Sequence, residues 1–134
     1  GLLGNPFGLF QTEEVAADID FTTNDGLQRH VIQFLLDQNA TALIPIIKCE
    51  SEFKHFEKTG EVLRNREGSS AIGVAQIMSS VHPDPQVLKR YNKRFGTDLS
   101  VKDFDITTVS GNLEYSLVLY KLRGLRDWEC AKYI

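Results

Sequence analysis

A glutamate on an apolar helical face is the residue of this chain best suited to chemistry. The i, i+3, i+4, i+7 spacing of one helix face fits Leu43, Ile46, Ile47 and Glu50, and Phe53 extends the stripe. Burial disfavours an ionised carboxylate and raises its pKa, so a glutamate in this position can hold its proton near neutral pH. The pattern therefore predicts a general acid at Glu50.

A structural role for Glu50 is the alternative. A glutamate on such a face can lie at the edge of the stripe, or pair with a cation across a helix contact. Lys48, Arg64 and Arg66 are close enough in the sequence to supply that cation. The neighbouring motifs must decide between the two roles.

The composition is that of an ordinary globular domain. The chain has 134 residues, of which 42% are hydrophobic and 25% are charged, and its formal net charge is -3. This length suits one domain with its own core, and no apolar run is long enough to span a bilayer. The slightly negative charge gives no general attraction to nucleic acid. We expect a monomer with no membrane span that does not bind nucleic acid.

Helices dominate the expected secondary structure. Residues 1–23 mix glycine, proline and acidic residues without helical periodicity, which predicts an N-terminal arm ahead of a domain over residues 24–134. Helices are expected over residues 27–40, from residue 41 through Glu50, over residues 85–96 and over about 112–122. The first of them has an apolar stripe of Leu27, Val31, Phe34 and Leu35.

Two segments between these helices break the helical pattern. Residues 57–70 are polar and contain two glycines, which predicts an exposed excursion, with a hairpin around residues 61–65, that forms one wall of a cleft. Residues 69–78, SSAIGVAQIM, then place Gln76 among small and apolar residues. This composition implies a close approach of backbones. Gln76 either satisfies a buried backbone group or binds a ligand.

Several common catalytic arrangements are missing from the sequence. It contains no P-loop, GxGxxG, HExxH or GxSxG motif, and we expect neither a metal nor a cofactor. The two cysteines, Cys49 and Cys130, lack metal-ligand spacing and form either one long-range disulfide or two buried thiols. A Cys49 nucleophile with His55 as its base is disfavoured, because side chains six positions apart on one helix point in different directions.

The last helix carries a polar stripe of Asn112, Tyr115 and Ser116. Amide groups beside an aromatic ring suit a sugar, which needs hydrogen bonds and a flat surface for stacking. Alternatively, Asn112 caps the helix and Tyr115 belongs to the core. The stripe alone does not separate these interpretations.

Three motifs occur in order around Glu50: CESEF, GVAQIM and GNLEYSLVLY, followed by a glycine and a tryptophan. Together, over about residues 43–128, they resemble the lytic transglycosylase domain of the soluble-lytic-transglycosylase (SLT) type, in the lysozyme-like superfamily. The resemblance implies a mainly α (α+β lysozyme-like) fold. In such a fold, a central helix carries the catalytic glutamate, and a small hairpin or loop excursion lies beside the cleft.

The resemblance also assigns roles to residues. Glu50 matches the catalytic acid, and a family serine that contacts the N-acetyl group matches either Ser69 or Ser70, because the stretch from Glu50 to Gln76 is longer than usual. The substrate-binding positions implied by the resemblance are Ser51, Ser69, Ser70, Gln76, Met78, Asn112 and Tyr115.

In peptidoglycan, such an enzyme cuts the β-1,4 bond between N-acetylmuramic acid and N-acetylglucosamine. The resemblance implies that Glu50 first protonates the glycosidic oxygen and then, as a carboxylate, accepts a proton from the C6 hydroxyl, which gives a 1,6-anhydromuramoyl product. A second carboxylate, which many glycosidases need, is not marked by any pattern. Glu52, Glu57, Glu61 and Glu67 are the nearest, and we expect them to be solvated.

Two other functions remain open from the sequence. A lysozyme-type muramidase would hydrolyse the same bond with water, and an inactive module would only bind the glycan. For the enzyme we expect a periplasmic, extracellular or cell-wall-associated location. The first residues lack the basic start of a secretory signal, so any signal or further domain would lie outside this sequence.

The C-terminal sequence departs from the family. Many members have an Ala-Tyr-Asn-x-Gly motif after the later helix, whereas this chain has GLRDWECAKYI. Trp128 is the candidate to close the cleft in its place. If Cys130 pairs with Cys49, the bridge ties this segment to the residue beside Glu50.

Overall fold

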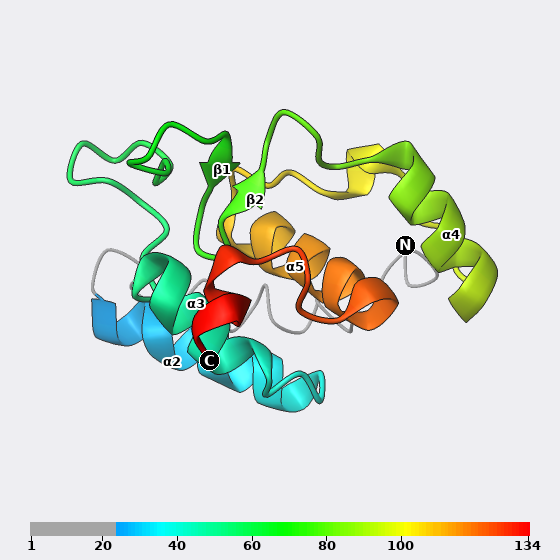
Figure 1. Cartoon of the computed structure of the whole chain (residues 1–134), viewed down its shortest axis with the longest axis horizontal. Coiled ribbons are helices and arrows are strands. Elements are labelled where there is room, and N and C mark those ends of the chain that lie inside the picture. Colours follow the sequence, from blue (N-terminus) through cyan, green and yellow to red (C-terminus); the bar gives the residue numbers. More distant parts are fainter. Residues whose placement is uncertain (1–23) are drawn as a thin grey trace.

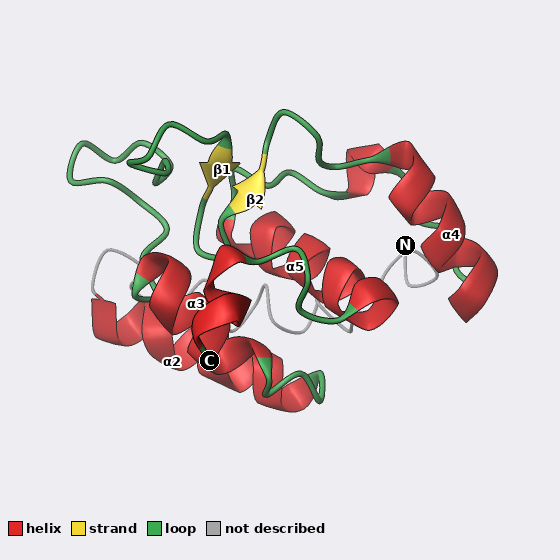
Figure 2. Ribbon diagram, viewed as in Figure 1, coloured by secondary structure: helices red, strands yellow, loops and turns green. Residues whose placement is uncertain are grey.

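The computed structural model describes residues 24–134, and the expected arm over residues 1–23 lies outside them. The described chain is mainly helical, as predicted, with one small sheet (Figure 1, Figure 2). No helix in residues 24–134 is long and apolar enough to cross a membrane. The elements are α2 (Asn24–Asp37), α3 (Leu43–Ser51), β1 (Ala71–Ile72), β2 (Ile77–Met78), α4 (Pro85–Phe95), η2 (Val101–Asp103), α5 (Val109–Arg123) and η3 (Glu129–Tyr133).

Helix α5 forms the centre of the core. Its residues are buried on every side from Gly111 to Leu113 and from Tyr115 to Leu119, and Figure 1 shows the other elements around it. The predicted α2 stripe packs into the same core, because Leu27, Val31, Phe34 and Leu35 are all buried. The helix that carries Glu50 is therefore held against a continuous apolar core.

The start of α5 differs from the sequence interpretation in which Asn112 caps the helix. Thr108 is the N-cap, and its hydroxyl accepts the N–H of Gly111 at 3.0 Å. A Cβ at Gly111 would overlap the backbone carbonyl of Asp105, so the first turn of α5 packs directly on the preceding loop. Asn112 is thus inside the helix and free for another role.

Helix α3 begins at Leu43 and ends at Ser51, and Pro45 lies in its first turn as predicted. Glu52 and Phe53 have φ angles of 55° and 62°, and these left-handed conformations turn the chain away from the helix axis. Phe53 is buried but lies after the helix, so the helical stripe does not extend to it as expected. The turn leaves Glu50 in the last turn of α3.

The predicted excursion follows this turn. It leaves α3 as a long loop (Figure 1), with isolated bridges between Phe56 and Val62 and between Arg64 and Ile72. Strands β1 and β2 then pair antiparallel, with Ala71 opposite Met78. The hairpin expected around residues 61–65 is therefore wrong in position, because that stretch forms only the isolated bridges at Val62 and Arg64. The hairpin is made by β1 and β2, whose connecting turn covers residues 73–76.

Helix α4 follows its sequence signals closely. The side chain of Asp84 accepts the N–H of Gln86, Pro85 occupies the first helical position, and Gly96 ends the helix with a φ of 68°. This helix packs on α5. Neither the cleft described below nor the residues around Glu50 include any part of α4.

Candidate functional site

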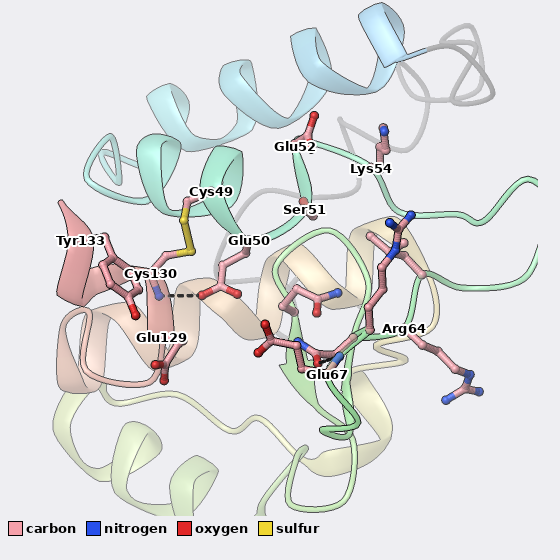
Figure 3. A pocket seen from close by; sticks show the side chains of 14 residues that line it. Cys49, Glu50, Ser51, Glu52, Lys54, Arg64, Glu67, Glu129, Cys130 and Tyr133 are labelled. Atoms are coloured by element: carbon pink, nitrogen blue, oxygen red, sulfur yellow. Dashed lines mark hydrogen bonds between the residues drawn. A yellow bond between two sulfur atoms is a disulfide. The ribbon is translucent and has the colours of Figure 1, made fainter.

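Glu50 lies where the apolar face of α3 meets the surface. Leu43, Ile46 and Ile47 are fully buried, whereas Glu50 is half-buried, so it occupies the edge of the stripe. One carboxylate oxygen, Oε2, accepts the backbone N–H of Cys130 at 3.0 Å (Figure 3). In the described part of the chain, no Lys or Arg forms an ion pair with Glu50. The cation partner of the structural alternative is therefore missing.

The surroundings raise the pKa of Glu50 above its usual value of 4.5. Desolvation by burial is the largest cause, because it disfavours the charged form. The Cys130 N–H opposes this effect by stabilising the carboxylate, and the negative charge of Glu129 adds to the increase. The side chain therefore keeps its proton to a higher pH than an exposed glutamate does.

The carboxyl group opens into a cleft of about 470 Å³, a size suited to a small organic ligand or a short stretch of a polymer. We call it the Glu50 cleft. One wall comes from α3 and its end, a second from the excursion and a third from the C-terminal segment (Figure 3). Its lining residues are Cys49, Glu50, Ser51, Glu52, Lys54, Leu63, Arg64, Asn65, Arg66, Glu67, Gln76, Glu129, Cys130 and Tyr133.

A disulfide joins Cys49 to Cys130, which decides between the two alternatives that the sequence left open. It links α3 to η3 with a Cα–Cα distance of 6.1 Å across 81 positions of sequence. The disulfide reaches Cys49, and the N–H of Cys130 donates to the adjacent Glu50. These two connections hold the C-terminal segment against the last turn of α3. The bridge also brings Glu129 and Tyr133 to the cleft.

The turn over residues 73–76 forms the opposite side of the site. Val74 receives two side-chain hydrogen bonds: its carbonyl accepts the Ser51 hydroxyl at 2.6 Å, and its N–H donates to Nδ1 of His55 at 2.9 Å. Both side chains are buried. The end of α3 and the loop after it thus fix this turn directly.

The backbone of Ala75 is likewise held by two side chains, which come from α5 and from the C-terminal segment. Its N–H donates to Oδ1 of Asn112, and its carbonyl accepts Nε1–H of Trp128, both at 2.8 Å. The Asn112 amide also donates to the carbonyls of Ile72 and Ile106. All four backbone groups of the turn at Val74 and Ala75 are therefore satisfied by buried side chains, as buried backbone requires.

The turn delivers Gln76 to the Glu50 cleft. Gln76 has a φ of 51°, an uncommon conformation for a residue with a side chain, and its amide nitrogen donates to the carbonyl of Gly73 at 3.0 Å. A left-handed non-glycine residue that is held in place by its surroundings is often part of a functional site. Gln76 satisfies a backbone carbonyl, which is one of the two roles that the sequence left open, and its side chain also lines the cleft.

Of the predicted catalytic and substrate-binding residues, the structure brings three together and leaves the others outside the Glu50 cleft. Glu50, Ser51 and Gln76 line it. Asn112 and Tyr115 are fully buried: Asn112 holds the turn, and the Tyr115 hydroxyl contacts Nδ1 of His82 and the N–H of Asp84. The polar stripe of α5 therefore faces protein, because the whole helix is enclosed by the core.

The remaining predicted residues lie on the hairpin. Met78 borders a smaller neighbouring hollow, which Gln76 also lines together with Trp128. Ser70 bonds to Ser80, and Ser69 to the N–H of Ala71, so both serines stabilise the outer end of the hairpin. Neither serine lines the Glu50 cleft.

Sequence reasoning predicted the excursion as one wall of the cleft, but it missed the side chains that line this wall and the residues of the C-terminal wall. Glu129 and Tyr133 come from the C-terminal segment, and Glu67 comes from the excursion with Arg64 and Arg66. No periodicity marks these positions. The two cysteines were the available signal for the C-terminal wall, because a bridge from Cys49 necessarily brings the neighbours of Cys130 to Glu50.

Gly73 permits the close packing of the turn. It has a φ of 77°, and a Cβ there would overlap the Asn112 amide and approach Cε1 of His55 to 2.7 Å. Gly73→Ala is therefore expected to lower the free energy of unfolding by about 3 kcal/mol, as the sum of backbone strain and overpacking. Urea denaturation tests this, with Gly60→Ala as a control that has a positive φ but open space around it. Equal losses in the two variants would contradict the packing argument.

His55 predicts a pH dependence of stability. Its Nδ1 accepts from Val74, its Nε2 contacts the carbonyl of Thr107 at 2.8 Å, and burial lowers its pKa below the usual 6.5. As the pH falls, His55 is therefore protonated in the unfolded chain at a higher pH than in the folded protein. The free energy of unfolding is expected to decrease as the pH falls below about 6.5. Glu50 has the opposite effect, because its raised pKa increases the free energy of unfolding as the pH falls.

Urea denaturation of Glu50→Gln between pH 7.5 and about 5.5 isolates the histidine contribution. His30 and His82 also have pKa values lowered by burial, so they act in the same direction as His55. Adding His55→Gln is expected to make the free energy of unfolding depend less steeply on pH. A stability that rises as the pH falls in the Glu50→Gln background would exclude this account.

Comparison of the chain with protein-family models, with curated proteins and with solved structures gave no match. The case for a function therefore depends on the site itself and on the motifs of the sequence.

Proposed function

We propose that this chain is a peptidoglycan-cleaving lytic transglycosylase with a lysozyme-like fold, and that Glu50 is its catalytic acid and base. The observation that carries the proposal is a half-buried glutamate with a raised pKa, which has no ion pair within residues 24–134 and faces a cleft opposite the Gln76 turn. A carboxyl group with a raised pKa holds its proton to a higher pH than an exposed glutamate does, and it can donate this proton to a leaving group. The motif order around Glu50 supplies the substrate class.

The hydrogen bond from Cys130 indicates where the proton resides. An N–H donor favours the unprotonated oxygen of a carboxylic acid, so the bond to Oε2 leaves the proton on Oε1. In the proposed reaction, this proton goes to the glycosidic oxygen between N-acetylmuramic acid and N-acetylglucosamine. The resulting carboxylate then accepts the proton of the muramoyl C6 hydroxyl as that oxygen attacks C1, which closes the 1,6-anhydro ring. Glu50 ends the cycle protonated, as it began.

The disulfide supports the proposed location. Disulfides form and persist in oxidising environments such as the bacterial periplasm and the cell exterior. The Cys49–Cys130 bridge is beside the catalytic residue, so its formation and the geometry of the site are linked. The proposed enzyme therefore suits the compartment in which peptidoglycan lies.

A muramidase that uses water is the second candidate, and one observation favours it. Glu67 and Glu129 line the same cleft as Glu50, although no pattern in the sequence marked either one. A second carboxylate across the scissile bond is what a hydrolytic mechanism uses to activate water or form a glycosyl intermediate. The two candidates share the acid and differ in the nucleophile.

Purified peptidoglycan sacculi test the proposal. The wild-type protein is expected to reduce the turbidity of a sacculus suspension and to release soluble muropeptides, whereas heat-denatured protein releases none. Sedimentation with the sacculi without release of fragments would identify a glycan-binding module and contradict the enzyme.

The rate is expected to fall as the pH rises through the pKa of Glu50, because the first step needs the protonated acid. Since burial raises that pKa, the decline begins at a higher pH than an exposed glutamate would give. The pH profile of kcat/KM measures it. Glu129→Gln removes one cause of the raised pKa and is expected to move the decline to lower pH. A shift to higher pH would contradict the electrostatic account.

A further inference from the structure

An exposed aromatic ring lies on the wall of the Glu50 cleft. Tyr133 is 76% exposed, and it is the one large exposed hydrophobic side chain, among those of residues 25–134, that lines this cleft. The other exposed aromatic rings of the described chain, Phe56 and Phe95, lie outside the cleft. An aromatic residue in this position leaves a large apolar surface in water.

The Tyr133 side chain also has no partner among residues 24–134. Phe56 packs edge-on against His55 at 4.8 Å, and Phe95 packs against Tyr91 at 4.5 Å. Within the described residues, Tyr133 has no ring contact, and its hydroxyl makes no hydrogen bond. Its position therefore contributes little to the packing of the fold.

The backbone of Tyr133 is nevertheless held close to Glu50. Residues three apart in a 3₁₀ helix lie above one another, so Tyr133 is on the same side of η3 as Cys130. Cys130 is fixed to α3 by the disulfide and bonds to Glu50 through its N–H. Figure 3 shows the Tyr133 side chain at this edge of the site, near Cys130. An exposed ring is thus presented from a tethered backbone.

The chemistry around the ring suits a sugar. A pyranose ring has an apolar face of C–H groups and a perimeter of hydroxyl and amide groups, so a sugar site combines a flat aromatic surface with polar side chains. The Glu50 cleft offers both, because Asn65, Gln76 and Glu129 line it together with Tyr133. A tyrosine that is exposed beside these groups matches that description.

We infer that Tyr133 is a substrate-binding residue whose ring stacks on an N-acetylhexosamine ring of the glycan strand, next to the sugar attacked at Glu50. The inference rests on the proposed function and extends it to the C-terminal wall. It assigns a binding role to a segment that departs from the family pattern. Because the ring contacts a sugar beside the scissile bond, it contributes to binding rather than to proton transfer.

Binding is measured in the Glu50→Gln background, so that the ligand stays intact. The probe is a soluble tetrasaccharide of alternating N-acetylglucosamine and N-acetylmuramic acid, titrated by calorimetry. Adding Tyr133→Ala is expected to weaken the Kd about tenfold, whereas Tyr133→Phe keeps the ring and is expected to stay within about twofold. Phe95→Ala, an exposed aromatic of α4 outside the cleft, is the matched control and is expected to leave the Kd unchanged.

Three results would overturn the inference: a Kd for Tyr133→Ala within about twofold of its parent, a Phe variant as weak as the Ala variant, or no tetrasaccharide binding by the parent itself. Circular dichroism checks that the variants are folded, which is expected because Tyr133 is exposed.

Kinetics on sacculi separate this inference from the proposed function. With the catalytic glutamate present, Tyr133→Ala is expected to raise KM about tenfold and leave kcat close to that of the wild type, because the stacking acts equally on bound substrate and transition state. An unchanged KM in an active enzyme would overturn the role of Tyr133 alone. A wild-type protein that binds the tetrasaccharide through Tyr133 but cleaves nothing would instead overturn the proposed function.

Discussion

Glu50→Gln is expected to lower the rate of glycan cleavage by about 10³-fold, within the range for removal of a general acid. Glutamine is close to glutamate in shape, and its amide oxygen can still accept the N–H of Cys130. It has no proton to give to the leaving oxygen at any accessible pH. The free energy of unfolding is expected to change by less than about 1 kcal/mol, because Glu50 is half-buried and forms no ion pair with another described residue.

The release of soluble muropeptides from sacculi measures this effect, with urea denaturation as the check on the fold. Glu61→Gln is the matched control, since Glu61 is an exposed glutamate of the excursion outside the cleft. The control is expected to retain wild-type activity. A Glu50→Gln variant that cleaves at the wild-type rate would remove Glu50 from the mechanism.

The second large effect is expected from the disulfide. Replacing Cys49 and Cys130 with Ala releases a loop of 81 positions of sequence, which costs about 4.5 kcal/mol in the chain-entropy description of a cross-link. The released segment carries the N–H that bonds to Glu50 and the indole that holds Ala75, so activity is expected to fall together with stability. Urea denaturation and sacculus digestion measure the two effects.

The reduced wild-type protein provides the control. A dithiol reductant is expected to lower the stability of the wild type to that of the double Ala variant and to leave the variant unchanged. Stability that does not respond to the reductant, with thiol titration showing two free thiols, would contradict a structural role for the bridge.

The helical framework could be predicted from the sequence because its signals are local. The apolar stripe from Leu27 to Leu35, Pro45 in a first turn and Asp84 as an N-cap each depend on neighbours a few positions away. Glu50 was found for the same reason, since its spacing from Ile46 and Ile47 marks a helix face. The half-burial of Glu50 was harder to foresee, because periodicity indicates on which helix face a side chain lies but not how far it is buried.

The excursion was predicted as one wall of the cleft, whereas the C-terminal wall could not be predicted, because long-range contacts create it. Tyr133 and Glu129 reach Glu50 through a disulfide whose existence the sequence left open. Asn112 was assigned to the cleft from its motif, whereas its amide holds the turn that delivers Gln76. A polar residue on a helix that the core encloses on every side must satisfy protein groups, and only the fold shows that enclosure.

The product of the reaction tests the central claim most directly. The soluble muropeptides that the wild-type protein releases from sacculi can be separated, and their masses can be measured by mass spectrometry without prior chemical reduction. If Glu50 acts as acid and then as base on the C6 hydroxyl, the new muramoyl ends are 1,6-anhydro rings, which lack one water and resist borohydride. Muramoyl ends that carry the added water and are reduced by borohydride would show that water is the nucleophile and would contradict the transglycosylase.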